Sequence, residues 1–219
     1  MKKMKNLVLS GQSIVIDGSG MTLRGNGRCA TEVRDIDGSF EVVTVRGAFH
    51  VHVVPADVAQ AVVTGDENLL RLVDLEVVDG VLTVGVAQNV AYSSAHLLHV
   101  RLQVPQVAAV CLVGAGSVTV MDVQRDGFAI EISGAGTVTA AGRVDTVLLR
   151  LPGSGSIDTA ALRAAHADIE LKGVGDVDTC ASTSAKVRLS GVGNVRVLGQ
   201  PAELDVECGP AGAVTFPER

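Results

Sequence analysis

The sequence predicts an all-β protein whose C-terminal half is a parallel β-helix, a solenoid built from coils of about 19 residues. Three observations support this fold class: a recurring Gly-x-Gly motif, apolar residues that alternate on both sides of it, and the composition. Of 219 residues, 25 are Gly and only 2% are aromatic. A chain rich in Val, Ala, Leu and Gly suits thin, closely stacked β-structure.

The Gly-x-Gly motif recurs at a nearly constant interval. Its five copies are Gly114–Gly116, Gly134–Gly136, Gly153–Gly155, Gly173–Gly175 and Gly191–Gly193. Successive first glycines are 20, 19, 20 and 18 residues apart. A fixed period of this size is typical of a solenoid in which each repeat is one coil. Glycine suits the corner of a coil because it tolerates positive φ and lets backbones approach closely.

Apolar residues alternate with other residues before and after each motif. Those four and two positions before the first glycine are Val110 and Leu112, Ile130 and Ile132, Leu149 and Leu151, Ile169 and Leu171, and Val187 and Leu189. Those four positions after it are Val118, Val138, Ile157, Val177 and Val195. A period of two predicts strands with one face in the core. The variable remainders, 141–146, 160–166, 180–184 and 198–201, are expected to close each coil as a third short side or a loop.

The outward positions predict parallel coils stacked in register. Three residues before each first glycine the sequence has Cys111, Glu131, Arg150, Glu170 and Arg188, and five residues after it Thr119, Thr139, Asp158, Asp178 and Arg196. In coils ~4.8 Å apart, the first set forms an alternating acid–base column. The final turn is irregular, as expected where a solenoid must not offer an open strand edge.

Residues 1–105 are predicted to form a less regular β-rich part with hairpins, continuous with the repeat β-helix of residues 106–219. Segments 41–46 and 49–54 alternate, but residues 40–105 show no regular coils. Asp79-Gly80 lies between two alternating runs and predicts a hairpin with a type I′ turn. No linker-like stretch separates the two parts, so one continuous body is expected.

Coils of the form apolar-x-apolar-x-Gly-x-Gly-x-Val resemble the head GIN domain, the auto-transporter adhesin family of bacterial proteins. The resemblance covers Val107 to about Val214 and extends more loosely to Gly65–Leu70 and Val77–Leu82. It implies a right-handed parallel β-helix, usually in exported or surface proteins. It implies no catalytic residue, and none is assigned.

Composition and motifs exclude several classes of function. The net charge of −6 argues against a phosphate-neutralising surface, and the scarcity of aromatic rings removes the stacking platforms of nucleic-acid-binding proteins. No stretch approaches the ~20 apolar residues of a membrane span. No Gly-x-Ser-x-Gly motif or C-x-x-C pair occurs, and the four cysteines are expected to be isolated buried thiols. We therefore expect no enzyme, no cofactor, no nucleic-acid partner and no membrane insertion.

Two weak candidate sites remain. Asp158 and Asp178, with Asp176 nearby, form either a solvated acidic face, a weak Ca²⁺ site, or a carboxylate pair for a carbohydrate-active β-helix enzyme. His50 and His52 lie two apart on a strand, and form either a histidine pair without metal or two ligands of a small-ligand or metal site.

The favoured function is a non-enzymatic adhesin-like or scaffold protein that acts through its coil faces and by self-association. Its expected partners are a second copy, another protein or a surface glycan. Lys2, Lys3 and Lys5 precede an apolar run of only three residues, shorter than the roughly 7–15 of a secretory signal. As written, the chain is expected to be cytoplasmic; if a leader has been removed, a surface or secreted location is expected.

Overall fold

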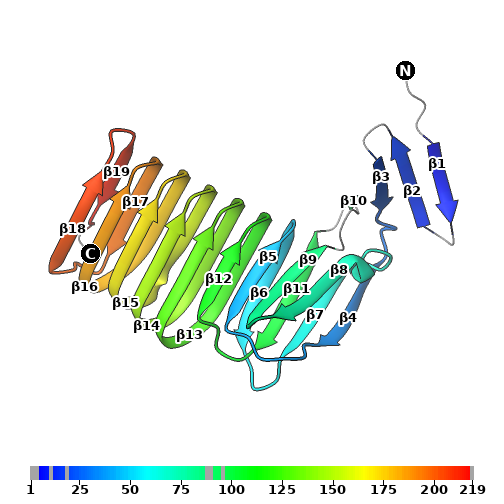
Figure 1. Ribbon diagram of the computed structural model, residues 1–219, viewed down its shortest axis with the longest axis horizontal. Coiled ribbons are helices and arrows are strands. Elements are labelled where there is room, and N and C mark those ends of the chain that lie inside the picture. The colour runs from blue at the N-terminus through cyan, green and yellow to red at the C-terminus, as the bar shows by residue number, and fades with distance from the viewer. Residues whose placement is uncertain (1–4, 10–11, 18–19, 87–90, 95–96, 218–219) are drawn as a thin grey trace.

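The computed structural model describes all residues except 1–4, 10–11, 18–19, 87–90, 95–96 and 218–219. The described residues form 19 strands and one 3₁₀ turn, Leu70–Leu72. The coils stack into a β-solenoid of about five turns, so the predicted all-β fold class and the solenoid are confirmed (Figure 1).

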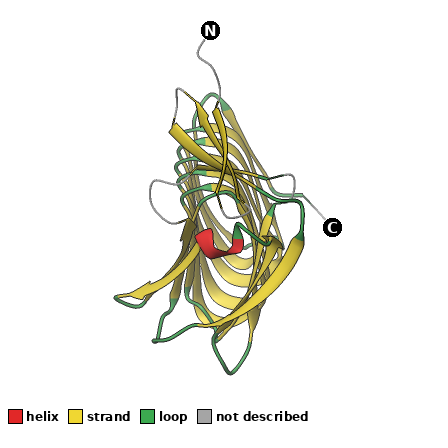
Figure 2. Cartoon of the chain, turned by 90° about the vertical axis from the view of Figure 1, so that its right-hand side faces the viewer, coloured by secondary structure: helices red, strands yellow, loops and turns green. Residues whose placement is uncertain are grey.

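The repeats form one stack of parallel strands. These are β12 (Ala109–Leu112), β13 (Ala115–Ile132), β14 (Ala135–Leu151), β15 (Ser154–Leu171), β16 (Val174–Leu189) and β17 (Val192–Leu198). The register matches the sequence repeat, since Val118 pairs with Val138 and Val138 with Ile157. The long strands bend around the core, and Figure 2 shows them along the stack as nested arcs.

The variable remainders of the coils stay in the sheet. Residues 141–146, 160–166 and 180–184 lie within β14, β15 and β16, and shifts of register mark the places where coil lengths differ. One such shift lies between Thr139 and Gly142. Of the two alternatives expected for these three segments, the structure has the strand side and not the loop, because a bulged strand keeps most of their backbone groups paired with the next coil. The segment after β17 does leave the strand at Gly199.

The Gly-x-Gly corners bring the backbones of neighbouring coils into close contact. A Cβ atom on Gly155 would lie 1.8 Å from the carbonyl oxygen of Gly136. The φ of Gly155 is 146°, a conformation that other residues rarely adopt. Only glycine therefore fits at this corner.

The core is a row of apolar columns enclosed by the coils. The three predicted columns are each at most 2% exposed: Val110, Ile130, Leu149, Ile169 and Val187; Leu112, Ile132, Leu151, Leu171 and Leu189; Val118, Val138, Ile157, Val177 and Val195. Full burial of one such side chain stabilises a fold by about 1.5–3 kcal/mol. The core thus consists of stacked aliphatic rungs.

The first strands form a separate four-stranded sheet. Its members are β1 (Lys5–Leu9), β2 (Gln12–Asp17), β3 (Gly20–Arg24) and β10 (Ala91–Ser93). The strands β1, β2 and β3 are antiparallel neighbours, and β10 runs parallel to β3.

A second group of antiparallel strands joins the main sheet at its N-terminal end. It contains β4 (Cys29–Asp35), β7 (Gln60–Asp66), β8 (Val73–Val78) and β9 (Val81–Val86). The hairpin β8–β9 has the predicted turn, because Asp79 has a φ of 49° and Gly80 a φ of 77°. Positive φ at both central residues is what a type I′ turn requires.

Part of residues 40–105 adopts the coil register. The strands β5 (Val42–Arg46) and β6 (Phe49–Pro55) pair in parallel with β12 and β13. On their other side, β9 and β11 (Leu98–Val104) pair in parallel with them. The expectation that this region lacks regular coils is wrong for these strands. Gly47 occupies the first glycine position, but Phe49 replaces the second, so the Gly-x-Gly pattern is incomplete.

The last turn is only partly covered. The strand β18 (Glu203–Cys208) pairs with β16, and β19 (Gly212–Thr215) pairs with β17. Leu204 and Val206 continue two core columns, yet they are 51% and 39% exposed. The atypical terminal turn predicted from the sequence is confirmed.

Two further expectations concern cysteines and membranes. All four cysteines are free, but Cys29 and Cys208 are exposed and Cys111 and Cys180 are half-buried, so the expectation of buried thiols is wrong. Within the described part of the chain, no helix has the length and hydropathy to cross a lipid bilayer.

Substitution of Gly155 by Ala tests the close approach at the corners. We expect Gly155→Ala to lower the free energy of unfolding by about 2–4 kcal/mol, through steric overlap and backbone strain. Gly127→Ala is the matched control, because a Cβ there meets nothing within 4 Å. Its stability should be unchanged or raised by up to about 1 kcal/mol. Urea unfolding measures both, and equal effects would contradict this account of the corner.

Candidate functional site

Two outward columns follow the corners and form one continuous surface, which we name the polar face. The first column is His50, Ser117, Thr137, Ser156, Asp176 and Asn194; the second is His52, Thr119, Thr139, Asp158, Asp178 and Arg196. The histidine pair and the acidic patch, two separate candidates in the sequence, therefore lie toward opposite ends of this one surface.

The positions of the histidines relative to Gly47 explain why the two candidate sites share a face. His50 and His52 lie three and five positions after Gly47, as Asp176 and Asp178 do after Gly173. Val43, Val45 and Val51 occupy the apolar positions of the same pattern. This shared spacing is a sequence signal for the common face, but it is hard to recognise because the second glycine of the motif is absent.

At the histidine end, the side chains contact one another and a hydroxyl group. The ring of His50 stacks on that of His99, with centroids 5.0 Å apart and planes at 20°. Its Nδ1 atom forms a hydrogen bond with Ser117 Oγ. His52 lies between Arg101 and Thr119 in the ladder. Among the described residues, no three His, Cys, Asp or Glu side chains are grouped so that they could hold a metal ion.

The pKa of His99 is lowered. Burial is the main cause, because it penalises the charged imidazolium, and the charges of His50 and His52 act in the same direction. The folded protein therefore favours neutral His99.

At the acidic end, each carboxylate bonds within the sheet. Asp176 Oδ1 accepts hydrogen bonds from Asn194 N and Nδ2, at 3.1 and 2.8 Å. Asp178 accepts from Arg196 Nε and Nη2, at 2.8 and 3.1 Å. Asp158 Oδ1 accepts from the backbone N–H of Ala160 at 3.1 Å. The contacts of Asp176 and Asp178 join neighbouring coils and favour their register, and the contact of Asp158 lies within its own strand, β15.

A pair of carboxylates for glycoside hydrolysis has to act on one bond from two sides. Asp158 and Asp178 are direct neighbours in the ladder. Their oxygens nevertheless turn to different partners, one to its own strand and the other to the next coil. The carboxylates of the acidic patch thus bond to groups of the sheet itself.

The opposite sheet face carries the predicted acid–base column in register. Glu131 pairs with Arg150, Arg150 with Glu170, and Glu170 with Arg188 in the ladder. Arg150 Nε lies 3.9 Å from Glu170, while Arg188 contacts Asp205 at 2.8 Å. A hydrogen bond from Lys172 lowers the pKa of Glu170. Exposed pairs of this kind each contribute about 0–1 kcal/mol.

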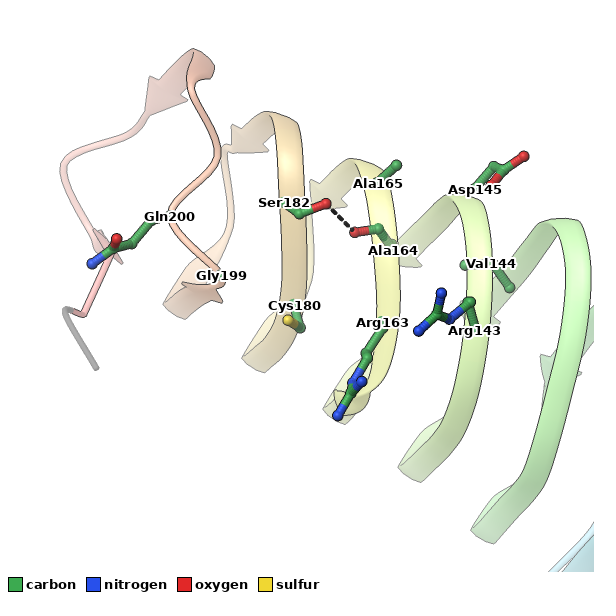
Figure 3. A pocket seen from close by; sticks show the side chains of 10 residues that line it. All are labelled: Arg143, Val144, Asp145, Arg163, Ala164, Ala165, Cys180, Ser182, Gly199 and Gln200. Carbon is green, nitrogen blue, oxygen red and sulfur yellow. Dashed lines mark hydrogen bonds between the residues drawn. The ribbon is translucent and has the colours of Figure 1, made fainter.

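The bulged segments between these two faces form a groove. Its larger part, about 590 Å³, is lined by residues that include Arg143, Arg163, Cys180 and Gln200 (Figure 3). A second hollow of about 460 Å³ shares Arg143 and Asp145 with it. This groove is not among the features expected from the sequence, because the lining segments differ in length and carry no repeated motif. The spacing of 20 residues between Arg143 and Arg163 was the available signal.

The lowered pKa of His99 predicts a pH dependence of stability. Unfolded His99 takes up a proton near pH 6.5, above the pH at which the folded form does. Stability from this group is therefore fully present above that pH and is lost as the pH falls through 6.5 toward the lower folded pKa. We expect the thermal midpoint to fall between pH 7.5 and 5.5, and to fall less in His99→Gln.

His166→Gln is the matched control for this measurement. His166 lies outside the histidine cluster and bonds to Ser184 Oγ at 2.8 Å. This variant should keep the pH dependence of the parent. A parent-like slope in His99→Gln would contradict the role of His99.

Comparison with known proteins supports the fold. A crystal structure of a "putative adhesin" from Bacteroides fragilis has a TM-score of 0.69 at 16% identity, over 89% of this chain and 99% of that chain. A "putative adhesin" from Parabacteroides merdae has a TM-score of 0.52 at 17% identity, over 90% and 99%. A "putative lipid binding protein" from Parabacteroides distasonis has a TM-score of 0.51 at 17% identity, over 89% and 96%.

A search of curated proteins finds no match. The family described as "Putative auto-transporter adhesin, head GIN domain" matches residues 39–201. This range begins just before β5 and ends just after β17, so it spans the coils described above. Because the match covers most of the sequence, the chain belongs to the head GIN domain family.

Proposed function

We propose that this chain is a non-enzymatic, adhesin-like binding protein that acts through the polar face of its solenoid. The polar face carries the proposal, because twelve side chains that can form hydrogen bonds lie there in two ordered columns. The naming of its family, and of two similar solved structures, as adhesins supports it.

A stacked sheet suits this role because its backbone fixes the spacing of the surface groups. Hydroxyl, amide and carboxylate groups repeat every ~4.8 Å along the stack. Because this surface is already ordered, binding of a partner costs little free energy for ordering the side chains and backbone of this protein. Many weak polar contacts in a row also allow avidity for a repetitive partner. The partner is another protein or a surface glycan.

An adhesive role requires exposure at the cell surface. Fractionation of the host and protease treatment of intact cells should show the protein in the surface fraction and sensitive to protease. A cytosolic marker protein in the same cells should remain intact, which controls for lysis. Protein that is found only in the soluble cytosol would contradict adhesion and leave an internal scaffold.

Self-association is the second part of the proposal. An end-to-end contact between two copies would cover Leu204 and Val206, which the last coil leaves exposed. Glu203, Asp205 and Glu207 alternate with these residues on β18 and would bring like charges together. Salt should therefore strengthen the contact by screening this repulsion.

Light scattering tests this contact. We expect a molar mass that rises from 22.5 kDa toward twice that value with concentration, and more steeply at high salt. Val206→Asp should remove the rise. Val174→Asp is the matched control, because Val174 is exposed on the side of the coils and belongs to no end contact. A molar mass of 22.5 kDa at all concentrations and salt levels would contradict the proposed self-association.

A further inference from the structure

We propose that the groove lined by Arg143 and Arg163 binds an acidic saccharide, with the two guanidinium groups holding its carboxylate or sulfate. The choice of a saccharide rests on the proposed adhesive function. The anion site itself rests on the geometry of the two arginines.

Arg143 and Arg163 are direct neighbours on adjacent coils. They are register partners of β14 and β15, and the column continues to Cys180 on β16. Parallel strands lie ~4.8 Å apart, so two positive side chains begin about that distance from each other. Both are exposed and extend from neighbouring coils at the groove (Figure 3).

The other arginines of the strands β13 to β17 have acidic partners, which makes this pair distinct within those strands. Those contacts are Arg125 with Glu41, Arg150 with Glu170, Arg188 with Asp205, and Arg196 with Asp178. Among the residues that the structure describes, Arg143 and Arg163 make no ion pair and no side-chain hydrogen bond. Their donors are therefore available to an external anion.

The chemistry of two adjacent guanidinium groups selects an oxyanion. Each presents a planar fork of N–H donors that matches the oxygens of a carboxylate, sulfate or phosphate. Two forks on successive coils can hold either one anion between them or two anions on successive units of a chain. The two guanidinium groups are thus suited to an oligomer that lies along the stack of coils.

The remaining lining residues favour a saccharide over a polyphosphate. Asp145 lies in the shared part of the groove, and Asp122 and Asp126 line its second hollow. The carboxylates repel a polyphosphate, which carries charge on every phosphoryl unit, more strongly than a saccharide, and they accept hydrogen bonds from the hydroxyls that a saccharide carries between its acidic groups. Each hollow, of about 590 and 460 Å³ respectively, is in the size range of ligand sites. Among the residues that the structure describes, no aromatic side chain lines either hollow, so these residues offer no stacking platform for nucleobases.

Calorimetric titration of the purified full chain tests the proposal. The probes are an oligogalacturonate, a sulfated oligosaccharide, a neutral oligosaccharide of equal length and inorganic phosphate. We expect binding of at least one acidic oligosaccharide and none of the neutral one, with affinity falling as salt rises. The two acidic probes distinguish a carboxylate from a sulfate as the bound group.

Three variants locate the site. Arg143→Gln and Arg163→Gln should each weaken binding at least tenfold, and Arg143→Lys should fall between Arg143→Gln and the parent. Arg150→Gln is the matched control, since it removes the same charge from the acid–base column, at a residue that does not line the groove. Thermal midpoints like that of the parent would show that the exposed substitutions leave the fold intact.

Several results would overturn the proposal. These are no binding of either acidic probe, equal binding of the neutral oligosaccharide, or equal losses in Arg150→Gln. Phosphate binding as tight as that of the saccharides would reassign the groove to phosphate and refute the saccharide. Failure here leaves the protease result on intact cells unaffected, so failure of this site and of the adhesive function are distinguishable.

Discussion

The structure depends on hydrogen bonding between successive backbones in one fixed register. From β13 to β16, each coil pairs in parallel with the next along nearly its whole length. The corners permit this because glycine lets carbonyl oxygens approach where a Cβ would overlap them, as at Gly155 and Gly136. Once the register is fixed, each sequence position becomes a column. The core, the polar face and the groove all follow from it.

The low aromatic content agrees with this geometry. A coil of about 19 residues encloses a narrow interior, and large rings in successive rungs would force neighbouring backbones apart. Val, Ile and Leu fill such rungs with few alternative rotamers. Two buried rings occur among the coils: Phe49 replaces a corner glycine, and Phe128 occupies a single rung beside Val147.

The sequence predicts those parts of the fold that repeat. Period-two alternation around Gly-x-Gly identifies the core columns and the outward columns of the coils, and Asp79-Gly80 identifies the hairpin. The sequence pattern does not predict the coil formed by β5 and β6, because Phe49 interrupts the Gly-x-Gly motif. In addition, the pairing of β5 with β12 joins segments more than 60 residues apart in the sequence. The repeat spacing also identifies the acidic patch, but the hydrogen bonds of this patch to Arg196 and Asn194 depend on side-chain directions that spacing does not predict. The groove arises from bulges, whose register shifts interrupt the repeat and leave only the spacing of 20 residues between Arg143 and Arg163 as a signal.

A solenoid places equal positions side by side, so every charge on its surface meets the same position of the next coil. Where signs alternate, as at Arg150 and Glu170, the contact adds a little stability. Where they repeat, as at Arg143 and Arg163, the cost in water is only about 1 kcal/mol at 4 Å. One buried rung residue stabilises the fold by about 1.5–3 kcal/mol, so the core outweighs such a repulsion. The residues of the surface columns can therefore differ from coil to coil with little effect on the stability of the fold. The binding chemistry of the surface can change in this way while the corners and the core remain constant.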